Sequence, residues 1–191
     1  IGLDFARVLR AFLRQDPDII LVGETRDTET AKIAVEAALT GHLVFTTLHA
    51  NDAPATFMRL SEMGIEPFLI STSVIGIVAQ RLVRRICGKC KEAYKPDPMI
   101  LKYLDLNEDT TLYKGKGCDV CSGTGYKGRV GVYEVLIVNE ELRHLIAEGA
   151  DTLAIRDAAI KSGMKSLKEY CLILLNEGLT TVDEVLRTVA V

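Results

Sequence analysis

The chain has 191 residues, of which 48% are apolar and 26% are charged, and its formal net charge is −3. No uninterrupted apolar run reaches the roughly 18 residues of a membrane-spanning helix, so we expect a water-soluble protein without a transmembrane segment. The acidic balance disfavours nucleic acid as a partner, because proteins that bind it usually present a broad basic surface. The chain opens on Ile1-Gly2-Leu3, without an initiator methionine or a secretory signal, and is interpreted as a fragment of a longer protein.

The first predicted element is an amphipathic helix over Asp4–Gln15, which Pro17 follows. Its apolar residues repeat at helical spacing, while Arg7, Arg10 and Arg14 gather on another face. The sequence therefore predicts a helix with a basic stripe turned outward.

Two predicted strands carry polar groups near their ends. Ile19–Val22 is a run of four apolar residues, expected to be buried, that leads through a glycine into Glu24. Leu43–Thr47 forms the second strand, with His42 at its start and His49 after its end. Because strands and helices alternate here, we expect a parallel sheet, and ligands of such sheets bind at the carboxyl ends of the strands. The sequence predicts a site at this edge.

Helix ends are indicated by capping residues, prolines and glycines. Asp27 or Thr28 caps the helix between the two strands, which leaves through Gly41. The next two helices are expected from Asp52 and Pro54 to near Gly64, and from Pro67 through Ala79 toward Arg81.

The second half of the chain begins with a polar stretch, Lys91–Pro98, which is expected to be a mobile connection. Arg129–Val138 alternates, which predicts a strand pair or a single edge strand. An all-helical bundle is expected to follow, with capping boxes at Ser166/Glu169 and Thr181/Glu184. Its helices are predicted over Glu140–Glu148, Thr152–Ser162, Ser166–Glu177 and Thr181–Val189.

Four cysteines form two close pairs with the spacing C-x-x-C. They are Cys87, Cys90, Cys118 and Cys121. Two such pairs supply the four sulfur ligands that tetrahedral zinc prefers, although residues 91–117 between them exceed the roughly 15 to 20 of a compact zinc ribbon. The alternative is two disulfides, which a reducing cytosol disfavours. The remaining Cys171 lies among leucine and isoleucine and is predicted to be buried.

A long pattern in the first half reads LRxxLRxDPDxxLVGExRDxETAxxAxxAAxTGHLVxxTLHxNDA, and MGIEPFLISTS, AQRLVRR, the four cysteines and GYKGRVGVYE follow it. Together these motifs resemble the secretion ATPases that drive type II secretion and type IV pilus assembly. The resemblance covers nearly the whole chain. It implies an α/β fold with a partial RecA-like parallel sheet over residues 1–83, a tetracysteine zinc subdomain over 84–130 and a helical subdomain over 131–191.

The resemblance also implies roles for single residues, with a Walker B segment over Asp18–Glu24 and a His box over Thr40–Asp52. Glu24 would hold the Mg²⁺ shell of ATP or the attacking water, and His49 would reach the γ-phosphate, with His42 beside it. For both histidines a plain hydrogen bond to a local carbonyl is the alternative. The basic candidates are Arg7, Arg10, Arg14 and Arg26. Of these, Arg10 and Arg14 would act across a subunit boundary, or else form an ordinary solvated face.

The same resemblance implies a homohexameric motor on the cytoplasmic side of the inner membrane that pushes on a polytopic platform protein, in the direction of assembly. The phosphate-binding motif G-x-x-x-x-G-K-[ST] is absent from these residues. We therefore expect no ATP hydrolysis by this stretch alone. The alternatives are a zinc-containing module that binds polypeptides without catalysis and, less favoured by the charge, a zinc ribbon for nucleic acid.

Overall fold

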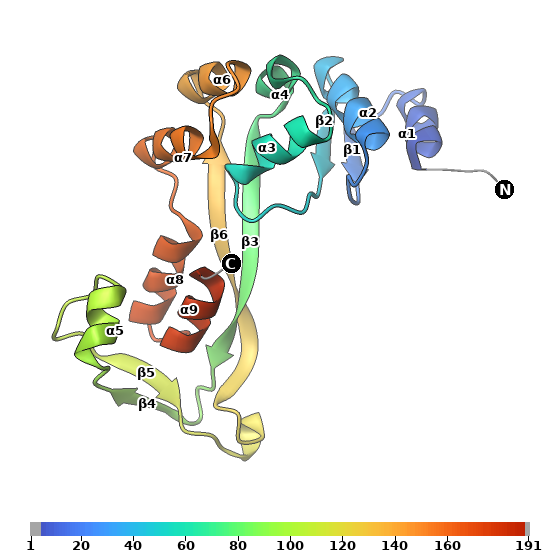
Figure 1. Cartoon of the computed structure of the whole chain (residues 1–191). Helices are drawn as coiled ribbons and strands as arrows, with labels where there is room; N and C mark the ends of the chain where they lie inside the picture. Colours follow the sequence, from blue (N-terminus) through green and yellow to red (C-terminus); the bar gives the residue numbers. More distant parts are fainter. Residues whose placement is uncertain (1–4, 190–191) are drawn as a thin grey trace. The chain divides into compact units, whose positions relative to one another are not determined.

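The computed structural model describes residues 5–189, with side chains over residues 6–188, so the predicted start of the first helix at Asp4 lies outside them. The chain folds into two compact units, each built from two separate segments of the sequence (Figure 1). Unit 1 comprises Ile1–Val78 and Val135–Met164, and unit 2 comprises Ala79–Glu134 and Lys165–Val191. The predicted division into three subdomains, with boundaries after residues 83 and 130, stays a prediction.

Unit 1 begins with two helices and two strands, α1 (Phe5–Leu13), β1 (Ile19–Val22), α2 (Thr28–Leu39) and β2 (Leu43–Thr46). The two strands pair in parallel, with Ile19 opposite Leu43 and Val22 opposite Thr46. This register confirms the predicted parallel sheet. Asp27 caps α2 by accepting the backbone N–H of Thr30 at 2.8 Å, also as predicted.

Only one face of this small sheet is covered by the described residues. Ile20 and Val22 are buried against apolar residues of α1 and α2. On the other face Ile19 and Leu21 are 62% and 77% exposed, so the prediction that the whole of β1 is buried is wrong. The reason is that α1 and α2 pack on the same side, and alternate residues of a strand point to opposite faces.

The rest of unit 1 contains two further pairs of helices, α3 (Ala55–Glu62), α4 (Pro67–Ser73), α6 (Glu140–Ala147) and α7 (Thr152–Lys161). Asp52 accepts the backbone N–H of Ala55 at 2.8 Å, which fixes the start of α3 where the sequence predicts it. Helix α6 packs on α4. Arg143 of α6 also donates to the carbonyl of Ser71 in α4 at 2.6 Å.

The helix predicted from Pro67 through Ala79 is shorter than expected, and this prediction is wrong. Helix α4 ends at Ser73, Val74 is extended, and strand β3 (Gly76–Ile86) begins two residues later. Hydroxyl groups of Ser71 and Ser73 bond to carbonyls within the helix, and the β-branched residues that follow favour a strand. Strand β3 pairs with β6 (Tyr126–Ile137), and the boundary between the units falls within both strands.

Unit 2 contains the cysteines and a core of its own. Strands β4 (Lys91–Tyr94) and β5 (Leu112–Gly115) pair antiparallel, with α5 (Pro98–Tyr103) between them in the chain. The helices α8 (Leu167–Asn176) and α9 (Val182–Val189) complete the unit. Leu104, Leu112, Val132, Leu175 and Val185 are among its fully buried residues. The prediction that Lys91–Pro98 is mobile is wrong for its first half, which is strand β4. The prediction fails because the pairing partner lies about twenty residues away, beyond any local signal.

The helices at the end of the chain are confirmed as helices, with α6 and α7 in unit 1 and α8 and α9 in unit 2. Ser166 and Glu169 form the predicted capping box. At α9 only half of it forms, because Thr181 accepts the N–H of Glu184 while the Glu184 carboxylate turns to Arg84. No helix within residues 5–189 is long and apolar enough to cross a bilayer.

The Arg84–Glu184 contact ties β3 to α9 inside unit 2. Both the backbone N–H and the guanidinium Nε of Arg84 donate to the carboxylate, at 2.6 and 2.9 Å. The side chain of Glu184 is 6% exposed. Burial alone raises its pKa, but the hydrogen bonds and charge of Arg84 outweigh burial and lower the pKa below 4.5. The ion pair therefore stabilises the fold above the ordinary pKa of a glutamate.

Substitution Glu184→Gln is expected to lower the free energy of unfolding of unit 2 by about 2 kcal/mol at pH 7, since a hydrogen bond to a charged group contributes about 1.5–3. Because the folded pKa lies below the unfolded one, this contribution is complete above pH 4.5 and is lost as the pH falls through the folded pKa. Urea unfolding at pH 7 and pH 3 measures both effects. The exposed Glu108→Gln is the control, and an equal loss in both variants would contradict the prediction.

Candidate functional site

Two of the polar groups predicted at one sheet edge, Glu24 and His49, do converge there. Past the paired strands, the N–H of Thr25 donates to the carbonyl of Thr47 at 2.9 Å, and the hydroxyl of Thr47 donates to the carbonyl of Gly23 at 2.6 Å. The hydroxyls of Thr25 and Thr46 lie 2.8 Å apart. These bonds hold the two chain segments side by side beyond the carboxyl ends of β1 and β2.

Glu24 lies between a histidine and an arginine at this edge. Nε2 of His49 is 2.8 Å from Oε1 of Glu24, and a guanidinium nitrogen of Arg26 is 2.5 Å from Oε2. The side chain of Glu24 is 24% exposed, whereas that of His49 is 87% exposed. The hydrogen bond from Arg26 is the main cause that lowers the pKa of Glu24 below 4.5, against a smaller rise from burial. Glu24 is therefore an ionised carboxylate at neutral pH.

One oxygen of this carboxylate has capacity left for a ligand. Oε1 of Glu24 is buried and, among the described residues, has the imidazole of His49 at 2.8 Å but no established hydrogen-bond donor. An ionised oxygen without a donor is costly in a buried position. A hard cation such as Mg²⁺, or a water molecule held for it, meets this need. The residues present thus fit the Mg²⁺–nucleotide group that the sequence predicts.

Arg26 is the member of this site that the sequence does not single out as a partner of Glu24. A signal is nevertheless present, because residues two apart in an extended segment point to the same side. Glu24 and Arg26 stand at that spacing directly after β1.

The structure does not bring His42 to this edge. His42 precedes β2, and its Nδ1 lies 3.0 Å from the carbonyl of Ala37 and 3.1 Å from the hydroxyl of Thr40. Since a carbonyl only accepts, Nδ1 carries the hydrogen in that contact. His42 thus has the local carbonyl bond considered as the alternative, at the amino end of the strand.

The two arginines predicted to act across subunits lie at the surface of unit 1. A guanidinium nitrogen of Arg10 is 2.8 Å from a carboxylate oxygen of Glu29 in α2, with both side chains about half exposed. Arg14 follows α1 and is exposed. Neither residue is seen to contact Glu24 in the described part of the chain, and their role across a subunit boundary stays a prediction.

The segment that carries His49 is anchored at its far end. One carboxylate oxygen of Asp52 caps α3, and the other lies 2.5 Å from a guanidinium nitrogen of Arg156 in α7. The two side chains are 21% and 35% exposed. The hydrogen bonds of Thr47 with Thr25 and Gly23 hold the near end, so both ends of this six-residue connection are fixed.

The four cysteines form a cluster in unit 2 that fits a metal ion. Their Sγ atoms all lie within 4.8 Å of one another. The separations Cys87–Cys118, Cys90–Cys121 and Cys118–Cys121 are 3.9, 3.8 and 3.7 Å. A tetrahedron of sulfur at about 2.3 Å from a zinc ion has edges of about 3.8 Å. Disulfides need about 2.05 Å, so the disulfide alternative is wrong for this structure, in which all four thiols are free.

Backbone N–H groups prepare one of these cysteines as a ligand. The amides of Cys118 and Gly125 point to Sγ of Cys121, at 3.2 and 3.3 Å. Burial raises the pKa of the Cys121 thiol, but these amides and the neighbouring thiols lower it to about 6. Gly125 has φ +77° and lies so close to Gly115 that a side chain on it would collide with backbone. The glycines of this region therefore let the chain fold around the sulfur atoms.

A small parallel sheet with a carboxylate and an imidazole at its edge, in a chain that also carries a four-cysteine cluster fit for a metal ion, defines a mixed α/β protein. The chain belongs to the family described as "Type II/IV secretion system protein", whose profile matches residues 1–187. The resemblance drawn from the sequence is thereby confirmed.

Individual relatives agree with this family. The type IV pilus assembly ATPase PilB of Thermus thermophilus is 57% identical over 193 residues, which cover 98% of this chain and 22% of that protein. The type II secretion system ATPase E of Vibrio cholerae is 47% identical and is covered to 37%. Among solved structures, the pilus retraction motor PilT with bound ADP has a TM-score of 0.69 and 31% identity, over 97% of this chain and 43% of that one. The chain thus spans well under half of these relatives.

Proposed function

We propose that these residues are part of a motor ATPase that hydrolyses ATP to drive pilus or pseudopilus assembly, in type IV pili or type II secretion. The observation that supports this most is the contact between Glu24 and His49 at the carboxyl ends of two parallel strands. The names of the relatives as ATPases of these two systems support it independently.

In this proposal Glu24 holds the shell of the nucleotide-bound Mg²⁺ or the attacking water through its oxygen Oε1. Bound Mg²⁺ would neutralise charge that develops on the phosphates. Arg26 keeps Glu24 ionised, and His49, which is exposed beside it, reaches the γ-phosphate. His42 remains a candidate for nucleotide contact only if its bond to Ala37 opens. Arg10 and Arg14 are proposed to serve a neighbouring subunit of a homohexamer.

The proposal extends to the surroundings of the motor. A phosphate-binding loop is missing from these residues, so we expect hydrolysis only together with sequence that supplies one. The partner is a polytopic platform protein at the cytoplasmic face of the inner membrane. The four-cysteine cluster favours zinc, because zinc is the usual occupant of four-cysteine structural sites. The family resemblance, and relatives named for pilus assembly or type II secretion, favour assembly over retraction.

Nucleotide binding by the parent protein tests the proposal. With Mg²⁺ and a fluorescent non-hydrolysable ATP analogue, His49→Ala is expected to weaken binding about tenfold, as loss of one charge-assisted hydrogen bond does. His144→Ala is a matched control, since His144 is also exposed and lies 3.4 Å from a glutamate, Glu148. A polypeptide-binding adaptor would bind no nucleotide in either variant, and equal affinity of both variants would remove His49 from the site.

A further inference from the structure

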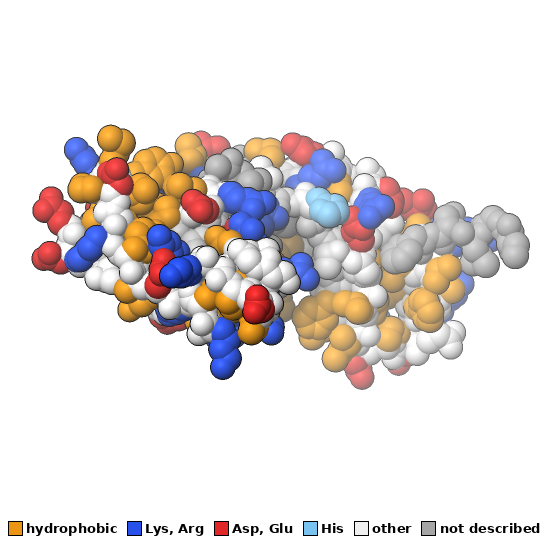
Figure 2. Space-filling view, turned by 90° about the horizontal axis from the view of Figure 1, so that it is seen from below, with side chains coloured by type: hydrophobic (Ala, Val, Ile, Leu, Met, Phe, Trp, Pro, Cys, Tyr) orange, Lys and Arg blue, Asp and Glu red, His pale blue; other side chains and the backbone are white. Residues whose placement is uncertain are grey.

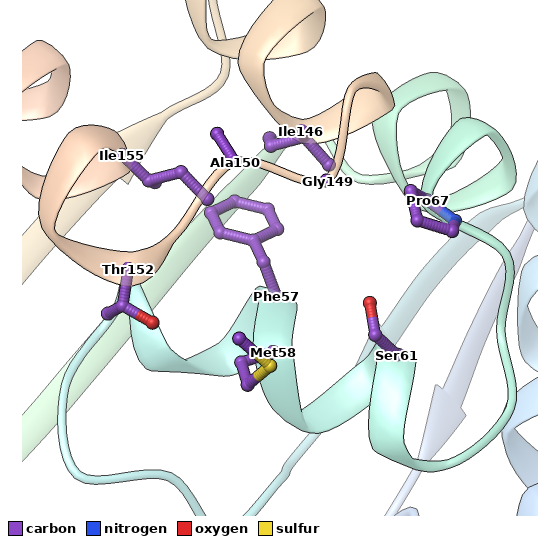
Figure 3. A pocket seen from close by; sticks show the side chains of 9 residues that line it. All are labelled: Phe57, Met58, Ser61, Pro67, Ile146, Gly149, Ala150, Thr152 and Ile155. Carbon is purple, nitrogen blue, oxygen red and sulfur yellow. The ribbon is translucent and has the colours of Figure 1, made fainter.

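A pocket unrelated to the sheet edge lies in unit 1, between α3, the start of α4 and the connection from α6 to α7 (Figure 3). Its volume is about 180 Å³. It is lined by Phe57, Met58, Ser61, Pro67, Ile146, Gly149, Ala150, Thr152 and Ile155. Figure 3 shows the ring of Phe57 rising from α3 toward Ile146 and Ile155. The walls are therefore mainly apolar, with hydroxyls of Ser61 and Thr152.

The size of this pocket restricts its occupant. Sites for nucleotides, cofactors and other drug-sized molecules measure about 300 to 1,000 Å³. A cavity of about 150 Å³ lined by leucine, isoleucine and phenylalanine holds one benzene ring. The volume of 180 Å³ therefore fits one aromatic or branched aliphatic side chain and excludes a second nucleotide.

The residues next to the pocket lining in sequence give its surroundings a negative charge. Glu62, Glu66, Glu148 and Asp151 are all exposed, and we call them the acidic rim. Figure 2 shows acidic and basic side chains interspersed over the face in view.

Arginines of the same helices do not cancel this charge. Arg143 donates to the carbonyl of Ser71, and Arg156 pairs with Asp52, outside the rim. Arg59 pairs with one member of the rim, Glu62, at 3.1 Å. His144, 3.4 Å from Glu148, compensates it only when protonated. The rim thus keeps a net negative charge beside an apolar pocket at pH 8.

We propose that the pocket binds one apolar side chain, aromatic or branched, from a polypeptide segment that carries lysines and arginines on both sides of it. A buried apolar anchor surrounded by charges is the arrangement in which a single side chain dominates binding. The acidic rim adds attraction to the flanking cations and speeds their association. This site is separate from Glu24 and His49, so the inference does not depend on the proposed ATPase function.

Peptide titration followed by fluorescence polarisation at pH 8 tests the proposal on the whole chain. The probe is a labelled seven-residue peptide with a central phenylalanine flanked by three alternating lysines and arginines on each side. Two matched peptides replace the phenylalanine by glycine, or the basic residues by glutamate. The basic peptide with phenylalanine is expected to bind at least tenfold more tightly than either matched peptide, because both the pocket and the rim contribute to its binding.

Two variants separate the pocket from the rim. Ser61→Trp fills the pocket. It is expected to weaken binding of the phenylalanine peptide at least tenfold and to leave binding of the glycine peptide unchanged. Glu66→Lys changes an exposed residue and leaves the core intact. It is expected to weaken binding of both basic peptides and to make that binding less dependent on salt. Glu36→Lys, on the exposed side of α2, is the charge-matched control. Thermal unfolding of each variant verifies that it is folded.

Equal affinities for the phenylalanine and glycine peptides would overturn the proposal, and so would unchanged binding by folded Ser61→Trp. If instead the chain self-associates in light scattering and Ser61→Trp abolishes this, the occupant is a second copy and the proposal is wrong. If the parent protein shows no ATP turnover but the peptide still binds as expected, only the proposed ATPase function is contradicted.

Discussion

Removal of the metal is expected to unfold the cysteine loops of unit 2. Isolated zinc fingers gain about 10 to 16 kcal/mol of apparent binding energy from the ion, which is as large as the whole stability of a typical domain, about 5 to 15 kcal/mol. The loops at 87–90 and 115–125 have few apolar residues to replace it, because Cys87 and Cys121 are themselves their buried members.

The measurement is amide hydrogen exchange of metal-loaded and chelator-treated protein, with zinc content determined on the same samples. Exchange at 87–90 and 115–125 should rise to that of an unfolded chain, while residues of α1 and α2 in unit 1 stay protected. Cys118→Ser should reproduce the effect of the chelator. Cys171→Ser is the matched control, because Cys171 is also buried but lies in the core of unit 2, outside the cluster. Unchanged protection in metal-free protein would show that the cluster needs no ion.

Elements with local signals can be predicted from the sequence, and elements that depend on distant partners cannot. Asp27 and Ser166 cap helices as expected because a cap involves only the next three residues. Strand β4 escapes prediction because only its antiparallel pairing with β5 makes the polar sequence from Lys91 extended. The same holds for β3, where an apolar run could belong to a helix or to a strand until its partner is known.

At the sheet edge, too, features that follow from local sequence and topology can be predicted, and contacts between distant residues cannot. Glu24 and His49 are predicted to meet because parallel strands place their carboxyl ends at one edge, and this geometry follows from topology alone. Proximity in sequence groups His42 with them, although it precedes the strand that His49 follows. The contact of Asp52 with Arg156, more than a hundred residues later, depends on how α7 packs and has no signature in the sequence.

Substitution Glu24→Gln in the parent protein is expected to reduce ATP turnover by about 10²- to 10³-fold, the usual cost of removing one preorganised charged or polar group from the transition state. Glutamine keeps the shape of the side chain but loses the negative charge that Arg26 and His49 face. Because the pKa of Glu24 is lowered from 4.5, the wild-type carboxylate stays ionised above that pH, and loss of activity between pH 5 and 7 should not arise from it.

Steady-state phosphate release from pH 5 to 9 measures both the loss of turnover and its pH dependence. Glu148→Gln is the control, since Glu148 also lies beside a histidine, His144, but is exposed and outside the sheet edge. If kcat falls while the KM for ATP changes little, Glu24 acts in the transition state; a rise in KM alone would make it a ground-state ligand of the nucleotide. Unchanged kcat and KM in Glu24→Gln would remove the carboxylate from the reaction. The proposed ATPase would then need another acidic residue for its Mg²⁺, and the buried oxygen of Glu24 would have no role in the reaction.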